Sequence, residues 1–220
     1  MSIYRQLDAA VAAFAERTGL SCPQGCGHCC LSENVEATVL ECLPLAFTLF
    51  RDGQADALLQ QLEDAGDRGR CVLYRPDLTQ AGLWGCSQYA TRPVVCRLFG
   101  FAGNRDRDGV PRLAMCRVIA ELSSSAAQTK LMPLRYIAEL SSSAAQTKLM
   151  PLRFMKDPAG TGNPLPMIED PQAPMPLFGE AGMRITALHP GLGTLRMPIN
   201  AALRQALMKV GMVLDLESQD

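Results

Sequence analysis

The sequence predicts a mainly α-helical protein with irregular, turn-rich segments, in which a small cysteine-cluster domain is followed by a Pro-rich C-terminal appendage. Apolar residues recur at helical spacing near both ends of the chain. Four cysteines fall within residues 22–30, and eight prolines fall within residues 158–198. Because such compositions do not suit regular elements, we expect both of these regions to be irregular.

Charge and hydropathy argue against several classes of partner. The 220 residues carry 21 Lys+Arg against 22 Asp+Glu, so no global field attracts nucleic acid or an anionic membrane. No apolar run approaches the roughly 18 residues of a membrane-spanning helix. The N-terminal residues lack the apolar core of a signal peptide. We therefore expect a cytoplasmic protein whose thiols stay reduced.

Amphipathic helices are expected at both ends of the chain, over residues 3–18 and 199–214. The apolar positions of the first are Ile3, Leu7, Val11 and Phe14. Gly19 is expected to end it. The last helix either docks on the core or mediates self-association, and docking is the favoured interpretation.

Two further helices are expected after the cysteine cluster. Thr38 with Glu41 three residues later forms a capping-box pattern that predicts the start of a second helix. Pro44 is expected to kink that helix or to split it. A third, more polar helix is expected over residues 54–64, with Gly66 near its end.

Between residues 71 and 116 the chain alternates short apolar pieces with turns. Residues 71–86 predict turns and a short hairpin, and residues 104–109 predict a charged surface turn. Pro93 fixes φ and suits the first turn of a helix, which would place Cys96 one turn later.

An internal duplication follows. Residues 119–135 recur without change at 137–153, an offset of 18 residues or about five helical turns. Each copy is expected to be a helix that stops near Pro133 or Pro151. Identity without drift favours a recent duplication or an artefact of the gene record over a functional repeat.

These features predict three parts. Residues 1–118 form a cysteine-cluster metal-binding domain, residues 119–154 a duplicated helical segment, and residues 155–220 a Pro/Gly-rich appendage that ends in the last helix. The appendage is expected to be extended or partly disordered before that helix.

The cysteines indicate a metal site. Nine cysteines in a reducing compartment are unlikely to be a disulfide framework, and clustered thiols suit metal. The loop spacing is C-x3-C-x2-C-C, and four more cysteines follow along the turn-rich segment. The expected ligands are Cys22, Cys26, Cys29, Cys30, Cys71, Cys86, Cys96 and Cys116. Cys42 lies on an apolar helix face, where we expect a buried small side chain.

Eight thiolates could fill two tetrahedral zinc sites, or one cluster with thiols to spare. They divide naturally into four from the loop and four from the later segment. Because neighbouring side chains point in different directions, Cys29 and Cys30 are expected to serve two sites, or one site and its surroundings. Thiolates suit zinc and iron–sulfur clusters alike, so zinc is expected, with iron or an iron–sulfur cluster as the alternative.

Charged neighbours could tune these thiols. Arginines stand beside three of the later cysteines, at Arg70, Arg97 and Arg117. Such guanidinium groups would offset the negative charge of a thiolate site and lower thiol pKa values. His28 is expected to be exposed or to lie beside the ligands.

The spacing of Cys22, Cys26 and Cys29 alone is also that of radical S-adenosylmethionine enzymes. The succession of strand–helix units and the Gly-Gly-Glu segment of that class are both missing. This interpretation is therefore disfavoured.

The cysteine pattern with the segment C-x2-Y-x2-R-P-x2-C-R-x-F at residues 86–99 resembles the YkgJ-type cysteine cluster family. The resemblance covers roughly residues 21–116 and implies a zinc- or iron-chelating domain. A related cysteine pattern in flagellin lysine N-methylases implies the iron–sulfur alternative, although no glycine-rich cofactor loop follows a strand here.

Three functions stay open from the sequence. The favoured one is a cytoplasmic protein that holds zinc in closed thiolate sites, is non-catalytic and serves an unknown protein partner. The second is an iron–sulfur protein with a redox or methyltransferase-related role. The third is a redox-active thiol protein whose cysteines cycle through disulfides.

Overall fold

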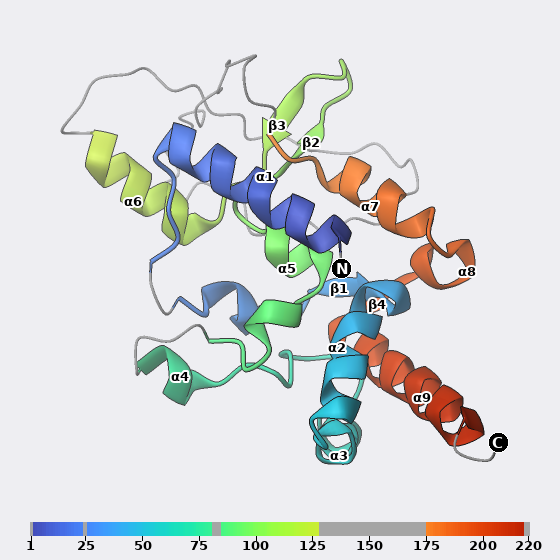
Figure 1. The fold of residues 1–220 in the computed structure, drawn as a ribbon. Helices are drawn as coiled ribbons and strands as arrows, with labels where there is room; N and C mark the ends of the chain where they lie inside the picture. Colours follow the sequence, from blue (N-terminus) through green and yellow to red (C-terminus); the bar gives the residue numbers. More distant parts are fainter. Residues whose placement is uncertain (1, 24–25, 81–84, 128–174, 218–220) are drawn as a thin grey trace.

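The structure, a computed structural model, describes residues 2–23, 26–80, 85–127 and 175–217, and these are mainly α-helical, as predicted (Figure 1). In chain order the elements are α1 (Ser2–Thr18), η1 (His28–Leu31), β1 (Glu36–Thr38), α2 (Val39–Arg51), α3 (Ala55–Ala65), α4 (Pro76–Gln80), η2 (Tyr89–Thr91), α5 (Val94–Leu98), β2 (Gly103–Arg105), β3 (Pro111–Leu113), α6 (Arg117–Ala127), α7 (Phe178–Thr186), α8 (Pro190–Gly193), β4 (Arg196–Pro198) and α9 (Ile199–Glu217). The strands pair only as two short antiparallel ribbons in this part of the chain.

Helix α1 confirms the first expected helix. It buries Leu7 and Phe14 of the predicted stripe, together with Tyr4, while Ile3 and Val11 of that stripe are partly buried. Tyr4 and Leu7 pack in a cluster with residues of α5 and α7, which lie beside α1 in Figure 1. The chain leaves the helix through Gly19, whose φ of 68° lies in the region that glycine adopts without strain.

Helix α2 begins as the capping box predicts. The Thr38 hydroxyl accepts a hydrogen bond from the Glu41 amide at 3.2 Å, and the Glu41 carboxylate accepts one from the Thr38 amide at 3.4 Å. The expected split at Pro44 is wrong, because α2 continues as one helix to Arg51. Its buried face, which includes Leu45, offsets the hydrogen bond that the proline cannot donate.

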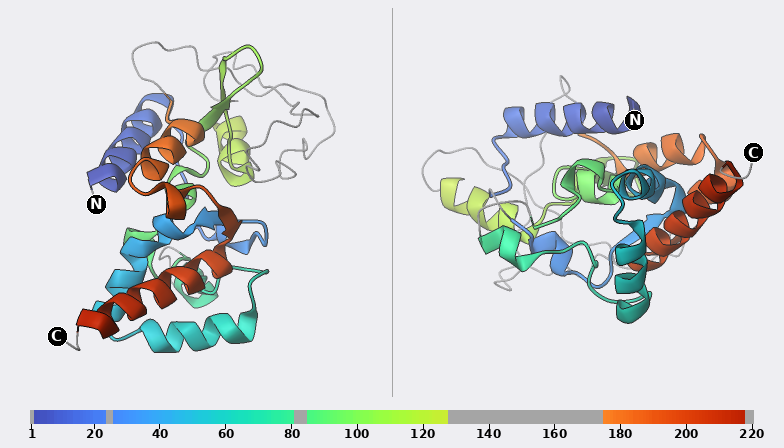
Figure 2. Two further views of the ribbon diagram at one scale, coloured as in Figure 1. Left: turned by 90° about the vertical axis from the view of Figure 1, so that its right-hand side faces the viewer. Right: turned by 60° about the horizontal axis from the view of Figure 1, so that its bottom comes forward.

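The C-terminal helix docks on the core, as favoured. Helices α2, α3 and α9 share one apolar cluster, to which α9 contributes Leu203, Ala206, Leu207 and Val210. Figure 2 shows α9 beside α2 and α3 in both views. None of the helices in the described ranges is long and apolar enough to cross a bilayer.

The expectation of an extended segment before α9 is wrong for residues 175–198. These residues form α7, α8 and β4. Ala181 and Ile185 of α7 are buried against α1 and α5, and β4 pairs with β1 in the register Ala37↔Met197. Burial of the apolar face of α7 and the hydrogen bonds between β4 and β1 stabilise regular structure in this segment despite its prolines.

The duplicated segment is described only in part. Its first copy begins within α6, and the remainder of that copy and the whole second copy lie outside the described residues. The three-part division at residues 118 and 154 therefore remains a prediction. The charged turn expected at residues 104–109 is confirmed for residues 106–109, which belong to the connection of the β2–β3 hairpin, whereas residues 104 and 105 lie in β2.

Candidate metal centre

The eight expected ligands come from five segments that the fold brings together. Four lie in the loop before η1 and within η1 itself. Cys71 follows α3, Cys86 follows α4, Cys96 lies in α5, and Cys116 precedes α6. The short helix η1 lies on the same side of the molecule as α4 and α6 in Figure 1 and in the right-hand view of Figure 2.

Cys29 lies at the centre of this group. Its thiol is hydrogen-bonded to that of Cys30, and the Cys22 and Cys26 thiols form a second such pair. The charge of Cys29 contributes to raising the pKa of thiols from all five segments. These are Cys22, Cys30, Cys71, Cys86, Cys96 and Cys116. Since such influence requires proximity, the cysteines are neighbours in space although they span 95 positions, from Cys22 to Cys116.

The pKa of the Cys29 thiol is lowered. The hydrogen bond from Cys30 is the main cause that lowers the pKa of Cys29 to about 7, and nearby backbone N–H groups and Arg92 act in the same direction against burial. A thiolate is the form that binds metal. The Cys30 hydrogen bond therefore makes Cys29 easier to ionise than an ordinary cysteine.

Backbone N–H groups support three of the later sulfurs. Each N–H group belongs to a residue two or three positions after the cysteine to which it donates. Its hydrogen bond lowers the pKa of that thiol, whereas burial raises the pKa by more. The pairs are Leu73 to Cys71, Gln88 to Cys86, and Val118 and Ile119 to Cys116. Such N–H groups stabilise sulfur as a thiolate, the state that a metal ligand requires.

Local backbone pairing holds Cys71 and Cys86 in neighbouring segments. Tyr74 and Cys86 form an antiparallel bridge, and the Arg75 amide donates to the Gly85 carbonyl at 2.8 Å. The Ser87 amide donates to the Leu73 carbonyl at 3.0 Å. The hairpin expected at residues 71–86 is thus present as this short bridge, with α4 inserted between its arms.

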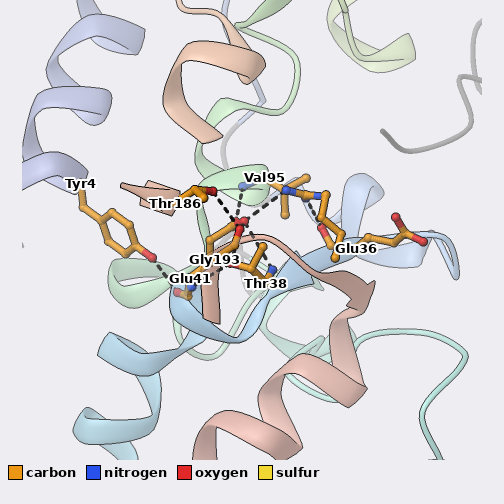
Figure 3. Close-up of polar contacts among 8 residues, drawn as sticks. Tyr4, Glu36, Thr38, Glu41, Val95, Thr186 and Gly193 are labelled. Carbon is orange, nitrogen blue, oxygen red and sulfur yellow. Dashed lines mark hydrogen bonds and ion pairs between the residues drawn. The ribbon is translucent and has the colours of Figure 1, made fainter. Parts of the chain in front are cut away.

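Helix α5 presents Cys96 as predicted. Pro93 is the N-cap of α5, and the Cys96 amide donates to the Pro93 carbonyl at 3.0 Å. The helix is fixed to α2 because the Val95 amide donates to the Glu41 carboxylate at 3.4 Å (Figure 3). The same carboxylate accepts from Arg196 of β4 at 3.2 Å.

Glu41 is the positioning residue that the sequence prediction missed. The capping box accounts for its contact with Thr38, but its contacts with α5 and β4 span 54 and 155 positions of the chain. The Glu41 residue is 2% exposed, which is rare for a carboxylate without several partners. An acidic residue on an otherwise apolar helix face is the sequence signal that could have indicated it.

Two of the three arginines expected to tune the thiols, Arg97 and Arg117, engage other groups instead. Arg97 is buried, forms an ion pair with Asp8 and stacks on the Tyr4 ring at 4.4 Å. Arg117 pairs with Glu121 at 2.7 Å on the surface. Both side chains thus engage other groups, because adjacency in sequence does not fix side-chain direction.

Arg75 and Arg92 stand near the sulfurs instead. Arg92 lowers the pKa of Cys29 and of Cys86, and Arg75 lowers the pKa of Cys71 and of Cys86. In each case the effect of the arginine is smaller than that of burial, which raises the pKa. These two guanidinium groups offset part of the negative charge that bound thiolates would carry.

Cys42 is a buried side chain, as expected. It is fully buried in the apolar cluster of α2 and α9, and burial raises its pKa well above the ordinary value. His28 begins η1 and is exposed. All nine cysteines are free thiols.

The thiols meet in pairs rather than in threes. Across the described ranges, no three Cys, His, Asp or Glu side chains are grouped so that they could hold a metal ion as they stand. The donor set nevertheless fits zinc or iron, because thiolates are soft ligands and several here are supported by backbone N–H groups. Rotation about side-chain bonds would be needed to bring the sulfurs to one point.

Comparison with known proteins gives one match. Residues 21–117 match the family described as "CxxCxxCC: Putative zinc- or iron-chelating domain". No curated protein and no solved structure matches the chain. The matched range includes all eight candidate ligands.

Proposed function

Because residues 21–117 belong to this zinc- or iron-chelating family, as their cysteine pattern predicted, we propose that the protein binds zinc through eight cysteine thiolates. The observation that carries the proposal is the convergence of five segments on Cys29. Burying this many thiols in one region has no packing advantage that alanine or valine would not give more simply.

Sulfur spacing supports zinc over a [4Fe–4S] cluster. In a tetrahedral site with Zn–S bonds of about 2.3 Å, neighbouring sulfurs are about 3.8 Å apart. Thiols that hydrogen-bond to each other, as Cys22 and Cys26 do, already stand near that separation. In a [4Fe–4S] cluster each cysteine binds a different iron atom, which holds the sulfurs further apart.

The free thiols also support a reducing compartment, so we place the protein in the cytoplasm. With every coordination position filled by sulfur, the zinc would be structural and would present no open position for a substrate. A role in presenting a surface to a protein partner is consistent with such closed sites.

Metal analysis tests the proposal. The protein is purified under anaerobic conditions without an affinity metal, and its zinc, iron and acid-labile sulfide are measured together with its visible spectrum. Zinc in a colourless protein is the expected result. Iron with acid-labile sulfide and a brown colour would refute the zinc assignment and support an iron–sulfur cluster instead.

Two variants complete this experiment. Cys96→Ser should lower zinc content and thermal stability together, because metal binding is coupled to folding. Cys42→Ala is the matched control, since Cys42 is buried outside the candidate ligands. Equal zinc in the wild type and in Cys96→Ser would refute the ligand assignment. A metal-free protein with titratable disulfides would support a redox-active thiol protein instead.

A further inference from the structure

The eight cysteines pack against two different parts of the hydrophobic core. Cys71 belongs to the cluster of α2, α3 and α9, and Cys86 and Cys96 pack against it. Cys116 belongs to a separate cluster with Phe14 of α1, against which Cys22 also packs. The core therefore separates the later cysteines, which the sequence alone had kept together.

The nearest charged neighbours of the loop thiols follow the same division. After burial, the pKa of Cys22 is raised by Cys26, Cys29 and Cys116. After its hydrogen bond with Cys29 and burial, the pKa of Cys30 is raised by Cys29 and then by two sulfurs of the other cluster, Cys96 and Cys86.

The remaining sulfurs agree with these two neighbourhoods. After burial and the backbone N–H groups of Val118 and Ile119, the thiols that raise the pKa of Cys116 are Cys29 and Cys26. Those that raise the pKa of Cys96 after burial are Cys71, Cys29, Cys86 and Cys42, in that order. Cys29 thus lies within reach of both neighbourhoods.

We propose that the protein binds two metal ions, one in each of two four-sulfur groups that divide the adjacent residues Cys29 and Cys30. The first sulfur group is Cys22, Cys26, Cys29 and Cys116. The second sulfur group is Cys30, Cys71, Cys86 and Cys96. This inference rests on the proposed function and assigns the ligands within it.

The proposed groups differ from a division by sequence order at two residues, Cys30 and Cys116. Sequence order would combine the four loop cysteines in one site and the four later ones in another. In the structure Cys30 joins the later cysteines, while Cys116, which precedes α6, joins the loop. The peptide between Cys29 and Cys30 then links the two sites, and the contact between their thiols makes the sites neighbours.

The two groups tie different elements together. The first would join the end of α1 and the loop to α6, and the second would join η1 to α5 and to the segments on either side of α4. A zinc ion with four thiolates carries a formal charge of about −2. Arg92 acts on Cys29 of the first group and on Cys86 of the second, so one guanidinium serves both.

Two double variants discriminate the two divisions. Both remove two cysteines, and both include Cys22→Ser. The wild type should hold two zinc ions per chain after dialysis against a moderate chelator. Cys22→Ser with Cys116→Ser should keep one ion, because both changes fall in the first group. Cys22→Ser with Cys30→Ser should keep none, because each change disables a different group.

Sequence order predicts the opposite result for this pair of variants, and that result would overturn the division. One ion per wild-type chain would also overturn it while leaving metal binding intact. A wild type without metal would instead overturn the proposed function itself.

If a double variant is insoluble, an experiment on the wild-type protein tests the same division of the cysteines. Limiting chelator releases part of the zinc, exposed thiols are alkylated, and the protected cysteines of each chain are identified by mass spectrometry. Protection of Cys22 should coincide with protection of Cys116. Coincidence of Cys22 with Cys30 would refute the division.

Discussion

Replacing Glu41 with glutamine tests whether the contacts in Figure 3 hold α2, α5 and β4 together. One carboxylate oxygen accepts from the Thr38 amide and from Arg196, and the other accepts from the Val95 amide. Glutamine keeps the shape, but one of its two terminal groups becomes a donor that faces another donor.

The magnitude follows from these partners. The glutamine side chain can adopt two orientations, and the less costly one places its NH2 group against the Val95 amide. That orientation leaves a buried N–H without an acceptor, which costs about 1–3 kcal/mol. Loss of charge opposite Arg196, whose side chain is 21% exposed, adds about 0–1 kcal/mol. We therefore expect the free energy of unfolding to fall by about 1–4 kcal/mol.

Urea denaturation at a fixed free zinc concentration measures this change. Glu33→Gln is the control, because Glu33 is exposed and its replacement should stay within about 0.5 kcal/mol. Zinc content should not change in either variant, since Glu41 positions a ligand-bearing helix and is not itself a ligand. A loss below about 0.5 kcal/mol for Glu41→Gln would refute the positioning role.

Three other predictions follow from the thiols. Cys42→Ala should keep the full zinc content and lose roughly 1 kcal/mol of stability, and any loss of zinc would make Cys42 a ligand. Arg92→Gln should raise the pKa of Cys29 and slow its alkylation at pH 7 roughly twofold in zinc-depleted protein, and an unchanged rate would remove Arg92 from the site. Burial raises the pKa of Cys71 to about 12, so the unfolded chain, whose thiols ionise near pH 8.5, releases this proton first. The contribution of Cys71 to the stability of zinc-depleted protein should therefore be constant below about pH 8.5 and be lost from there towards pH 12, and a Cys71→Ala variant that loses stability as steeply as the wild type in that range would contradict the burial of Cys71.

Local patterns predicted the local structure well. The start of α2 at Thr38, the exit from α1 at Gly19 and the placement of Cys96 one turn after Pro93 each depend on a few neighbouring residues. Capping, positive φ and the fixed φ of proline act over one helical turn. Patterns of that length can therefore be recognised without the rest of the chain.

Burial decided where local patterns were misleading. Pro44 and the prolines of residues 175–198 predicted interruption, yet α2 is one helix and α7, α8 and β4 are formed. In both places an apolar face has a partner far away in the sequence. Because propensities are worth less than the burial of several side chains, that partner determined the outcome.

The sequence by itself determined the chemistry of the candidate site: thiols in a family-specific pattern, spaced closely enough in the loop to meet in pairs. Only the tertiary structure decided which thiols are neighbours. Cys116 lies beside the loop because Ile119 and Phe14 share a core cluster, and Cys30 is near enough to Cys96 and Cys86 for their charges to raise its pKa. The arginines near the sulfurs likewise follow from the fold and not from adjacency. Neighbours along a chain point in different directions, whereas neighbours across a core are fixed by packing.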